Sequence, residues 1–213
     1  MSAAADHAYN LIRSKILEGV FLSGQRLKEG ELSVICDVSR TPVREALRKL
    51  TTDGLVLITP NSGAIVAEWD QEDIADIYRV RIQIEVLAAG LAAERRTEAQ
   101  LSLLEQAAEA IRALVDEATH REVHSEIARL NSDFHHLIIR AANSRALSMA
   151  ASQLIEAPLM LRTFRKYDLE RLSRSASDHL ELAAAIRTHD SELASSIMRS
   201  HILTGLRTLQ QGD

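Results

Sequence analysis

The sequence predicts a mainly α-helical protein with an N-terminal winged helix-turn-helix and a C-terminal all-α bundle of about six helices. Aromatic residues make up only 3% of a chain that is 46% hydrophobic. The core must therefore be built from Leu, Ile, Val and Ala, which favours packed helices over a β-sandwich. Two of the three prolines and six of the eight glycines lie before residue 91. Chain breakers are thus concentrated in the front of the chain and are rare in the back, which predicts one domain over residues 1–69 and a second over 70–213.

The first domain contains the signals of three short helices and a β-hairpin. Pro60-Asn61-Ser62-Gly63 is a turn sequence between two β-prone runs. In the second helix, Leu32 and Ile35 are expected to face inward. This order of elements is the winged helix-turn-helix layout. The expected elements are helices at 7–18, 29–36 and 41–53 and strands at 55–59 and 64–67.

The second domain shows helical periodicity almost throughout. Its faces are rich in alanine, which allows helices to pack closely. Asn143-Ser144 is a polar break between two of the helices. The expected helices cover residues 71–96, 98–118, 122–142, 145–166, 168–188 and 190–210.

Composition also excludes several classes of protein. The single cysteine, Cys36, rules out a disulfide framework and a Cys-rich zinc site, and its apolar neighbours predict an inert buried thiol. The longest apolar run, Val86–Ala93, is far too short to span a membrane, and the first residues do not resemble a signal peptide. The net charge of −5 argues against binding to a membrane surface. We expect a cytoplasmic protein.

Positive charge is concentrated at the third helix of the first domain. Residues 38–50 carry a balance of +3, although residues 1–70 as a whole carry −1. Arg40 and Arg44 lie one turn apart at the helix N-terminus, where they can reach phosphates or guanine edges. Ser39 and Thr41 have small hydroxyls that suit close contact with a DNA backbone. The pattern predicts an interface with double-stranded DNA.

Two further residues are candidates for the same interface. Gly63 at the hairpin tip would let the wing approach a groove closely. Arg48 lies one turn beyond Arg44, and for it a solvated position or an intramolecular ion pair is an equal alternative to DNA contact.

The runs Gln25–Leu32, Val38–Leu50, Asp53–Val56 and Pro60–Val66 resemble the DNA-binding domain of the GntR family, over about residues 8–68. The resemblance implies a dimeric repressor or activator that binds a short palindromic operator. It also implies DNA contacts at Arg40, Thr41, Arg44 and Gly63. Gly30 departs from the pattern, because some members carry there an Arg that touches DNA. We therefore expect a different operator preference.

Four residues of the second domain could converge on a metal ion. Asn131 and His135 are four apart and share one face of a predicted helix, while His179 and His201 lie on two later helices. Three imidazoles and an amide oxygen aimed into a bundle would suit a divalent ion such as zinc or nickel. Spacing alone leaves ordinary surface or capping histidines as the alternative.

The segments Asn131–His135, Asp178–Ile186 and Met198–Ile202 resemble the helical FCD ligand-binding domain of FadR-type GntR regulators, over about residues 72–210. The resemblance implies that Asn131, His135, His179 and His201 form a metal site. Many relatives have Asp as the first ligand, and Asn is a common alternative. The amide makes metal affinity the weaker part of this expectation.

A neutral set of ligands has an electrostatic consequence. Three neutral imidazoles and an amide leave the charge of a divalent ion uncompensated, so an anion is its natural partner. We expect a small carboxylate effector, such as a hydroxy acid, a sugar acid or a di-acid. Arg81 is the leading second anchor for it, because a guanidinium binds a carboxylate bidentately. The alternative for Arg81 is an ion pair with Glu85.

These features predict a transcriptional regulator, more specifically a repressor, whose DNA affinity responds to a carboxylate at the metal site. Two other functions remain open at this point. One is a metal-dependent enzyme that acts on a small organic acid. The other is a constitutive dimeric DNA-binding protein without an effector.

Overall fold

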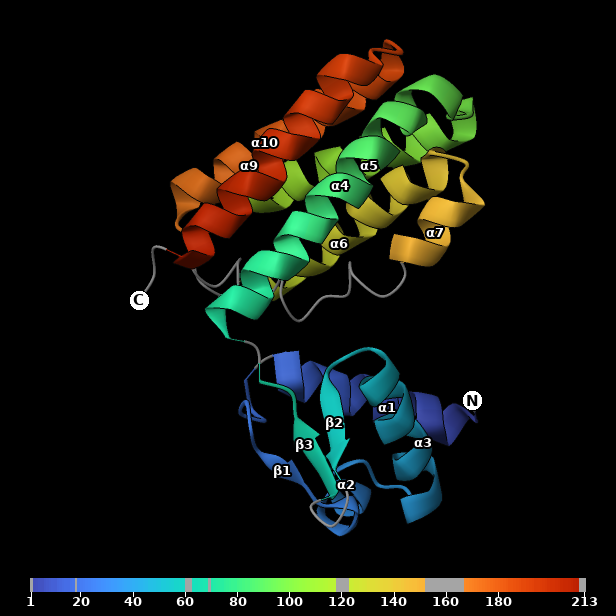
Figure 1. Ribbon diagram of the computed structural model, residues 1–213, viewed down its shortest axis with the longest axis vertical. Helices are drawn as coiled ribbons and strands as arrows, with labels where there is room; N and C mark the ends of the chain where they lie inside the picture. Colours follow the sequence, from blue (N-terminus) through green and yellow to red (C-terminus); the bar gives the residue numbers. More distant parts are fainter. Residues whose placement is uncertain are drawn as a thin grey trace. The chain divides into compact units, whose positions relative to one another are not determined.

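A computed structural model describes residues 2–17, 19–59, 63–68, 70–117, 123–151 and 167–210. The chain forms two compact units, Met1–Asp70 and Gln71–Asp213, which are described separately below (Figure 1). The fold class predicted from the sequence is confirmed, because a helix-turn-helix unit with a hairpin precedes an all-helical unit.

The first unit is a winged helix-turn-helix with a three-stranded sheet. Its strands pair antiparallel in the order β1-β3-β2, with Arg26 opposite Ile65 and Val56 opposite Val66. The sequence did not reveal β1, because a strand of two residues has no detectable alternation. The predicted turn residues 60–62 lie outside the described residues. The elements are α1 (Ala3–Leu17), β1 (Arg26–Leu27), α2 (Glu29–Ile35), α3 (Arg40–Thr52), β2 (Val56–Thr59) and β3 (Gly63–Val66).

The core of this unit orients α3. Four apolar side chains on one face of α3 are buried, namely Val43, Ala46, Leu47 and Leu50, as the sequence predicts. The prediction that Ile35 faces inward was wrong, because its side chain is 42% exposed. Cys36 is buried beside Leu32 instead. Leu32 and Cys36 are four residues apart and define the buried face of α2. Ile35 lies about 80° from the centre of that face.

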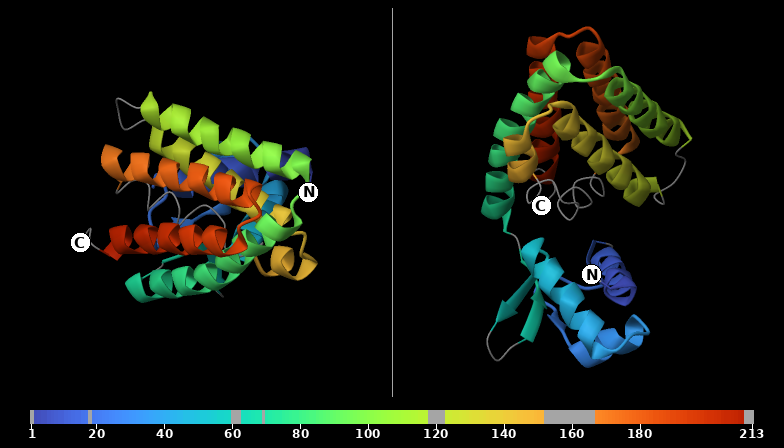
Figure 2. Two further views of the ribbon diagram at one scale, coloured as in Figure 1. Left: turned by 90° about the horizontal axis from the view of Figure 1, so that it is seen from above. Right: turned by 90° about the vertical axis from the view of Figure 1, so that its right-hand side faces the viewer.

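The second unit is a bundle of long helices. Helix α4 packs against α10, α6 and α9, and α5 packs against α6 and α9 (Figure 1, Figure 2). A capping box between Thr97 and Gln100 begins α5, and the Asp168 side chain caps the start of α9. The bounds are α4 (Gln71–Arg95), α5 (Glu98–Asp116), α6 (His124–Ala141), α7 (Arg145–Ala151), α9 (Leu169–Arg187) and α10 (Ser191–Gln210).

The predicted helix at 145–166 is described only over α7, and residues 152–166 lie outside the described part. Among the described helices, none combines the length and apolar character needed to cross a membrane.

Candidate nucleic-acid interface and metal centre

The candidate DNA-contacting side chains lie on the exposed face of α3 and at the start of β3. Ser39 is the N-cap residue of α3 and has an extended backbone, and its side chain forms no capping bond. Arg40, Arg44 and Arg48 are spaced by four residues, so they follow one stripe on the face opposite the buried residues. All six candidates are exposed: Ser39, Arg40, Thr41, Arg44, Arg48 and Gly63.

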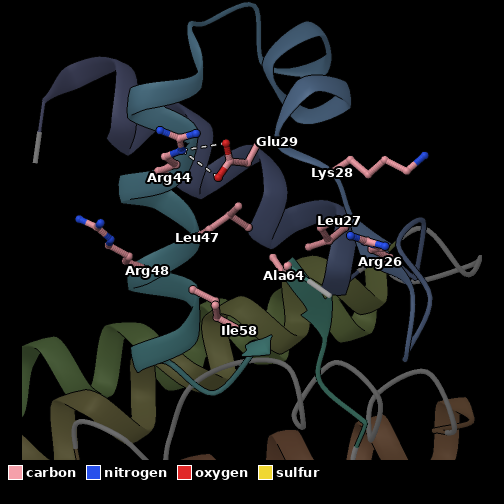
Figure 3. A pocket seen from close by; sticks show the side chains of 10 residues that line it. Arg26, Leu27, Lys28, Glu29, Arg44, Leu47, Arg48, Ile58 and Ala64 are labelled. Atoms are coloured by element: carbon pink, nitrogen blue, oxygen red, sulfur yellow. Dashed lines mark hydrogen bonds and ion pairs between the residues drawn. The ribbon is translucent and has the colours of Figure 1, made fainter. Parts of the chain in front are cut away.

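A pocket of about 690 Å³ separates α3 from the wing hairpin (Figure 3). We call it the wing pocket. Its lining combines apolar side chains with four cationic ones. A concave basic surface of this kind attracts the phosphates of DNA. The described residues that line it are Arg26, Leu27, Lys28, Glu29, Arg44, Leu47, Arg48, Ile58, Gly63 and Ala64.

Arg26 is a wing cation that the sequence analysis missed. Strand β1 pairs with β3, and the terminal Nη2 of Arg26 lies 4.0 Å from the position that a Cβ at Gly63 would occupy. Residues 60–66 contain no Lys or Arg of their own. Arg26 therefore brings positive charge to the tip of a wing whose own sequence has none. Only the pairing of β1 with β3 could have revealed this.

An ion pair joins the first turn of α2 to α3. Nε of Arg44 donates to both carboxylate oxygens of Glu29, at 2.9 and 2.8 Å. The hydrogen bond to Arg44 lowers the pKa of Glu29 and outweighs the opposing effect of partial burial. Beside it, Arg40 lies over Gly30, where a Cβ would be 3.5 Å from Nη2 of Arg40. In this chain, Arg40 thus lies next to a position that carries no side chain.

The second unit brings together the histidines singled out in the sequence. His135 of α6, His179 of α9 and His201 of α10 are buried, and each offers a ring nitrogen within 4.8 Å of the other two. We call these three residues the histidine cluster. Asn131, one turn before His135 on α6, is also fully buried. Three separate helices thus bring imidazole groups that can ligate a metal ion to one place in the bundle.

Two carboxylates orient the rings of the cluster. Nδ1 of His135 bonds Glu85 of α4, and Nδ1 of His201 lies 3.2 Å from Asp178 of α9. A carboxylate only accepts, so each Nδ1 carries the proton and each Nε2 presents a lone pair. These two Nε2 atoms face each other at 3.3 Å. Two lone pairs at this distance repel each other unless a cation lies between them.

The remaining two candidates have unsatisfied polar atoms. Both amide atoms of Asn131 are buried and have no hydrogen-bond partner among the described residues, and among these residues the buried ring of His179 is paired only with the backbone of Ser175. Buried polar groups are rarely left unpaired, because desolvation without a hydrogen bond is costly. The donor set of one amide and three imidazoles fits a divalent metal ion, which would engage Oδ1 of Asn131 and one ring nitrogen of His179.

Burial keeps two rings of the histidine cluster in the neutral form that can bind a metal ion. It lowers the pKa of His179 well below the ordinary value, and the neighbouring His201 and His135 add to this effect. It also lowers the pKa of His135, although Glu85 opposes the shift. Both rings are therefore neutral at neutral pH, which is the form that binds metals.

Arg81 lies in the same buried network. Its Nε donates to Glu85 at 2.7 Å, and both side chains are almost inaccessible to solvent. Burial would raise the pKa of Glu85, but Arg81 and His135 outweigh it and lower the pKa to about 2. The ion pair considered in the sequence analysis is thus present. The roles of Glu85 and Asp178 as ring partners were missed, because neither residue is close in sequence to the ring it contacts.

Comparison with known proteins gives matches along both units. Residues 4–66 match the model of the bacterial regulatory proteins of the gntR family, and residues 76–204 match the FCD domain. The HTH-type transcriptional regulator YdhC of Bacillus subtilis is 28% identical over 193 residues, which cover 91% of this chain and 85% of that protein. The HTH-type transcriptional repressor RspR of Escherichia coli is 28% identical over 198 residues, covering 91% and 83%. The solved structure of Escherichia coli McbR/YncC shares the fold, with a TM-score of 0.81, 22% identity and 99% coverage of both chains.

Proposed function

Because the chain belongs to the GntR family of bacterial regulatory proteins and carries an FCD domain, we propose that it is a dimeric repressor whose operator affinity responds to a small carboxylate bound at a metal ion. Family membership makes it a DNA-binding transcriptional regulator and not an enzyme. Repression is supported by the names of relatives such as RspR and the gluconate operon transcriptional repressor of Bacillus subtilis. The observation that carries the effector part is the histidine cluster with its unsatisfied Asn131.

The proposed operator contacts lie on α3 and at the wing. Arg40 and Arg44 read base edges or hold phosphates at the helix N-terminus, and Ser39 and Thr41 contact the backbone. Gly63 allows the wing to approach the DNA. Arg48 and Arg26 flank the wing pocket and add phosphate contacts.

The proposed metal ligands are Asn131, His135, His179 and His201, and the ion is zinc or nickel. Their mixed nitrogen and oxygen donors suit either of these metals. Bound there, the ion would supply an open Lewis-acidic position for an anionic ligand. Glu85 and Asp178 hold two of the rings in place and raise their basicity.

Charge supports a carboxylate as the effector. The four ligands are neutral, and of the two adjacent carboxylates Glu85 is already matched by Arg81. Positive charge would remain at the metal-loaded site, in surroundings of low polarity where charge interactions are strong. A hydroxy acid, sugar acid or di-acid would complete both the coordination and the charge balance. Arg81 is paired with Glu85 and almost inaccessible to solvent, so its charge is not counted as a second anchor for the effector.

The metal part is tested with a pair of histidine variants of the full chain. His179→Ala removes a buried ligand, so we expect the protein to lose stoichiometric metal at neutral pH, as measured by elemental analysis. His136→Ala is the matched control, because His136 lies beside His135 but bonds the Ser132 carbonyl outside the cluster. We expect this control to keep its metal. Retained metal in His179→Ala would contradict the site.

The same two proteins then test the effector. Small carboxylates are added to the metal-loaded His136→Ala control and to the His179→Ala protein, and operator binding is followed in mobility-shift titrations. We expect one class of carboxylate to weaken operator binding about tenfold for the control, which corresponds to a coupling of about 1.4 kcal/mol. His179→Ala should not respond. If no carboxylate changes the affinity of either protein, the chain is a constitutive DNA-binding protein.

A further inference from the structure

The contact between α2 and α3 holds Arg44 at one atom only. Both hydrogen bonds from Arg44 to Glu29 start at Nε, as the two dashed lines in Figure 3 show. The terminal Nη1 and Nη2 form no hydrogen bond to any residue in the described part of the chain. Glu29 therefore fixes the direction of the guanidinium and leaves its outer edge available.

This arrangement limits how Arg44 can approach a base. A guanidinium can bind O6 and N7 of guanine through Nε and one terminal nitrogen, or through both terminal nitrogens. Because Glu29 engages Nε, only the pair of terminal nitrogens remains, and Arg44 must approach end-on. Holding a long side chain in one orientation also reduces the entropy that it loses on binding.

The position of Glu29 is otherwise unfavourable for a DNA-binding surface. It is the one acidic side chain among the ten described residues that line the wing pocket, where Arg26, Lys28, Arg44 and Arg48 are cationic. A carboxylate at this place repels phosphates and weakens binding to any DNA sequence. An acidic side chain in the first turn of α2 also benefits from the helix dipole, but Glu31 provides the same benefit. What sets Glu29 apart is its contact with Arg44.

We propose that Glu29 is a positioning residue that gives Arg44 its base specificity at the expense of general DNA affinity. This inference rests on the proposed role of Arg44 in contacting DNA. It goes further by assigning sequence discrimination to a residue that itself touches no base. The low pKa of Glu29 keeps the carboxylate charged at neutral pH, so the contact persists under physiological conditions.

The test compares specific with general DNA binding. A duplex selected by the full chain from a random-sequence library serves as the specific probe, and a shuffled duplex of the same composition serves as the general probe. At one fixed salt concentration, Glu29→Ala should bind the shuffled duplex more tightly than the unmodified chain does. The ratio of the two dissociation constants should fall about fivefold or more, as expected when a good bidentate contact is weakened.

Glu31→Ala is the matched control. Glu31 lies on the same short helix and its carboxylate pairs with Lys28 at 2.7 Å, not with an arginine of α3. Removing it deletes the same charge, so affinity for both duplexes should rise together and their ratio should stay constant. Thermal melting checks that each variant is folded, and the partly exposed positions of both side chains make unfolding an unexpected result.

Arg44→Ala separates the failure of this inference from the failure of the proposed interface. If Arg44 contacts DNA, this variant loses operator binding and discrimination, and adding Glu29→Ala lowers the ratio no further. If Arg44→Ala lowers the ratio but Glu29→Ala does not, Glu29 forms an ordinary surface ion pair and the inference is wrong. If Arg44→Ala retains full discrimination, both the inference and the proposed role of Arg44 are wrong.

Discussion

At the scale of single residues, His135 shows how the bundle prepares a ring for ligation. Its Nδ1 bonds Glu85, and its Nε2 faces His201. Glu85 is itself held by Arg81, so α4 fixes a ring that α6 carries. A change in what binds at the cluster would therefore act on α4, the helix that begins directly after the first unit of the chain.

The histidine cluster predicts how metal retention depends on pH. A protonated imidazole cannot ligate, and the ordinary imidazole pKa is about 6.5. Because burial lowers the pKa of His135 and His179, their neutral forms persist somewhat below that value. The bound metal, and the stability that it adds, should therefore still be present at the ordinary imidazole pKa of about 6.5 and should be lost only as the pH falls further. Elemental analysis after gel filtration at each pH measures this. Complete loss between pH 8 and 7, where both rings are neutral, would contradict it.

The sequence predicted these ligand candidates better than it predicted their surroundings. Asn131 and His135 are one turn apart, so helical spacing alone places them together. His179 and His201 required the family resemblance, because spacing cannot say which faces of separate helices meet. Asp178 could not be assigned to His201 from sequence, since it is adjacent to His179 and 23 residues from the ring it contacts.

At the scale of elements, β1 determines the charge of the wing. Its pairing with β3 places Arg26 beside Gly63, although 36 positions separate them in the chain. The strand ends at Leu27, which is buried in the core of the first unit. This short strand therefore both anchors the start of α2 and supplies a cation to the hairpin tip.

Removing that cation should change the salt dependence of DNA binding. Arg26→Ala should weaken binding to the selected and the shuffled duplex alike. The slope of log affinity against log salt should become shallower by about 0.9 for each phosphate that the variant no longer neutralises. Mobility-shift titrations at several salt concentrations provide the slope. Lys15→Ala, which removes a positive charge from α1 outside the wing pocket, should leave the slope unchanged. An unchanged slope in Arg26→Ala would show that the wing does not use this residue.

Most elements were predictable, and the exceptions are the two-residue strand β1 and the buried face of the short helix α2. Periodicity over many residues indicated α4, α5, α9 and α10 with ends close to those observed. In α2, seven residues make too few turns to distinguish Ile35 from Cys36 as the inward side chain. Packing against α3 determines which face of α2 is buried. The spacing of apolar residues within α2 carries no information about this contact.

At the scale of the whole molecule, α4 carries an apolar stripe on the side away from its own bundle. Val80, Ile84, Leu87 and Leu91 follow the spacing 4-3-4, and Val80 and Leu87 are 44% and 53% exposed. The buried residues of α4, such as Tyr78, Ile82 and Glu85, lie on the opposite side. Such spacing suits the packing of one helix against another. Since regulators of this family commonly dimerise, we expect the stripe to contact a second copy of the chain.

A charge placed in the stripe should separate the dimer. It should therefore also remove the avidity that two linked DNA-binding units have for a palindromic operator. Leu87→Glu would bury an unpaired carboxylate at the interface, so the protein should sediment as a monomer at micromolar concentration. Each monomer would then bind one half-site without the benefit of a linked partner, and operator affinity should fall by about a hundredfold or more. Leu103→Glu is the control, because Leu103 on α5 is 50% exposed and lies outside the stripe. A Leu87→Glu protein that still sediments as a dimer would move the interface elsewhere. A monomer that retained full operator affinity would mean that the two DNA-binding units act independently, and symmetry would then contribute nothing to operator recognition.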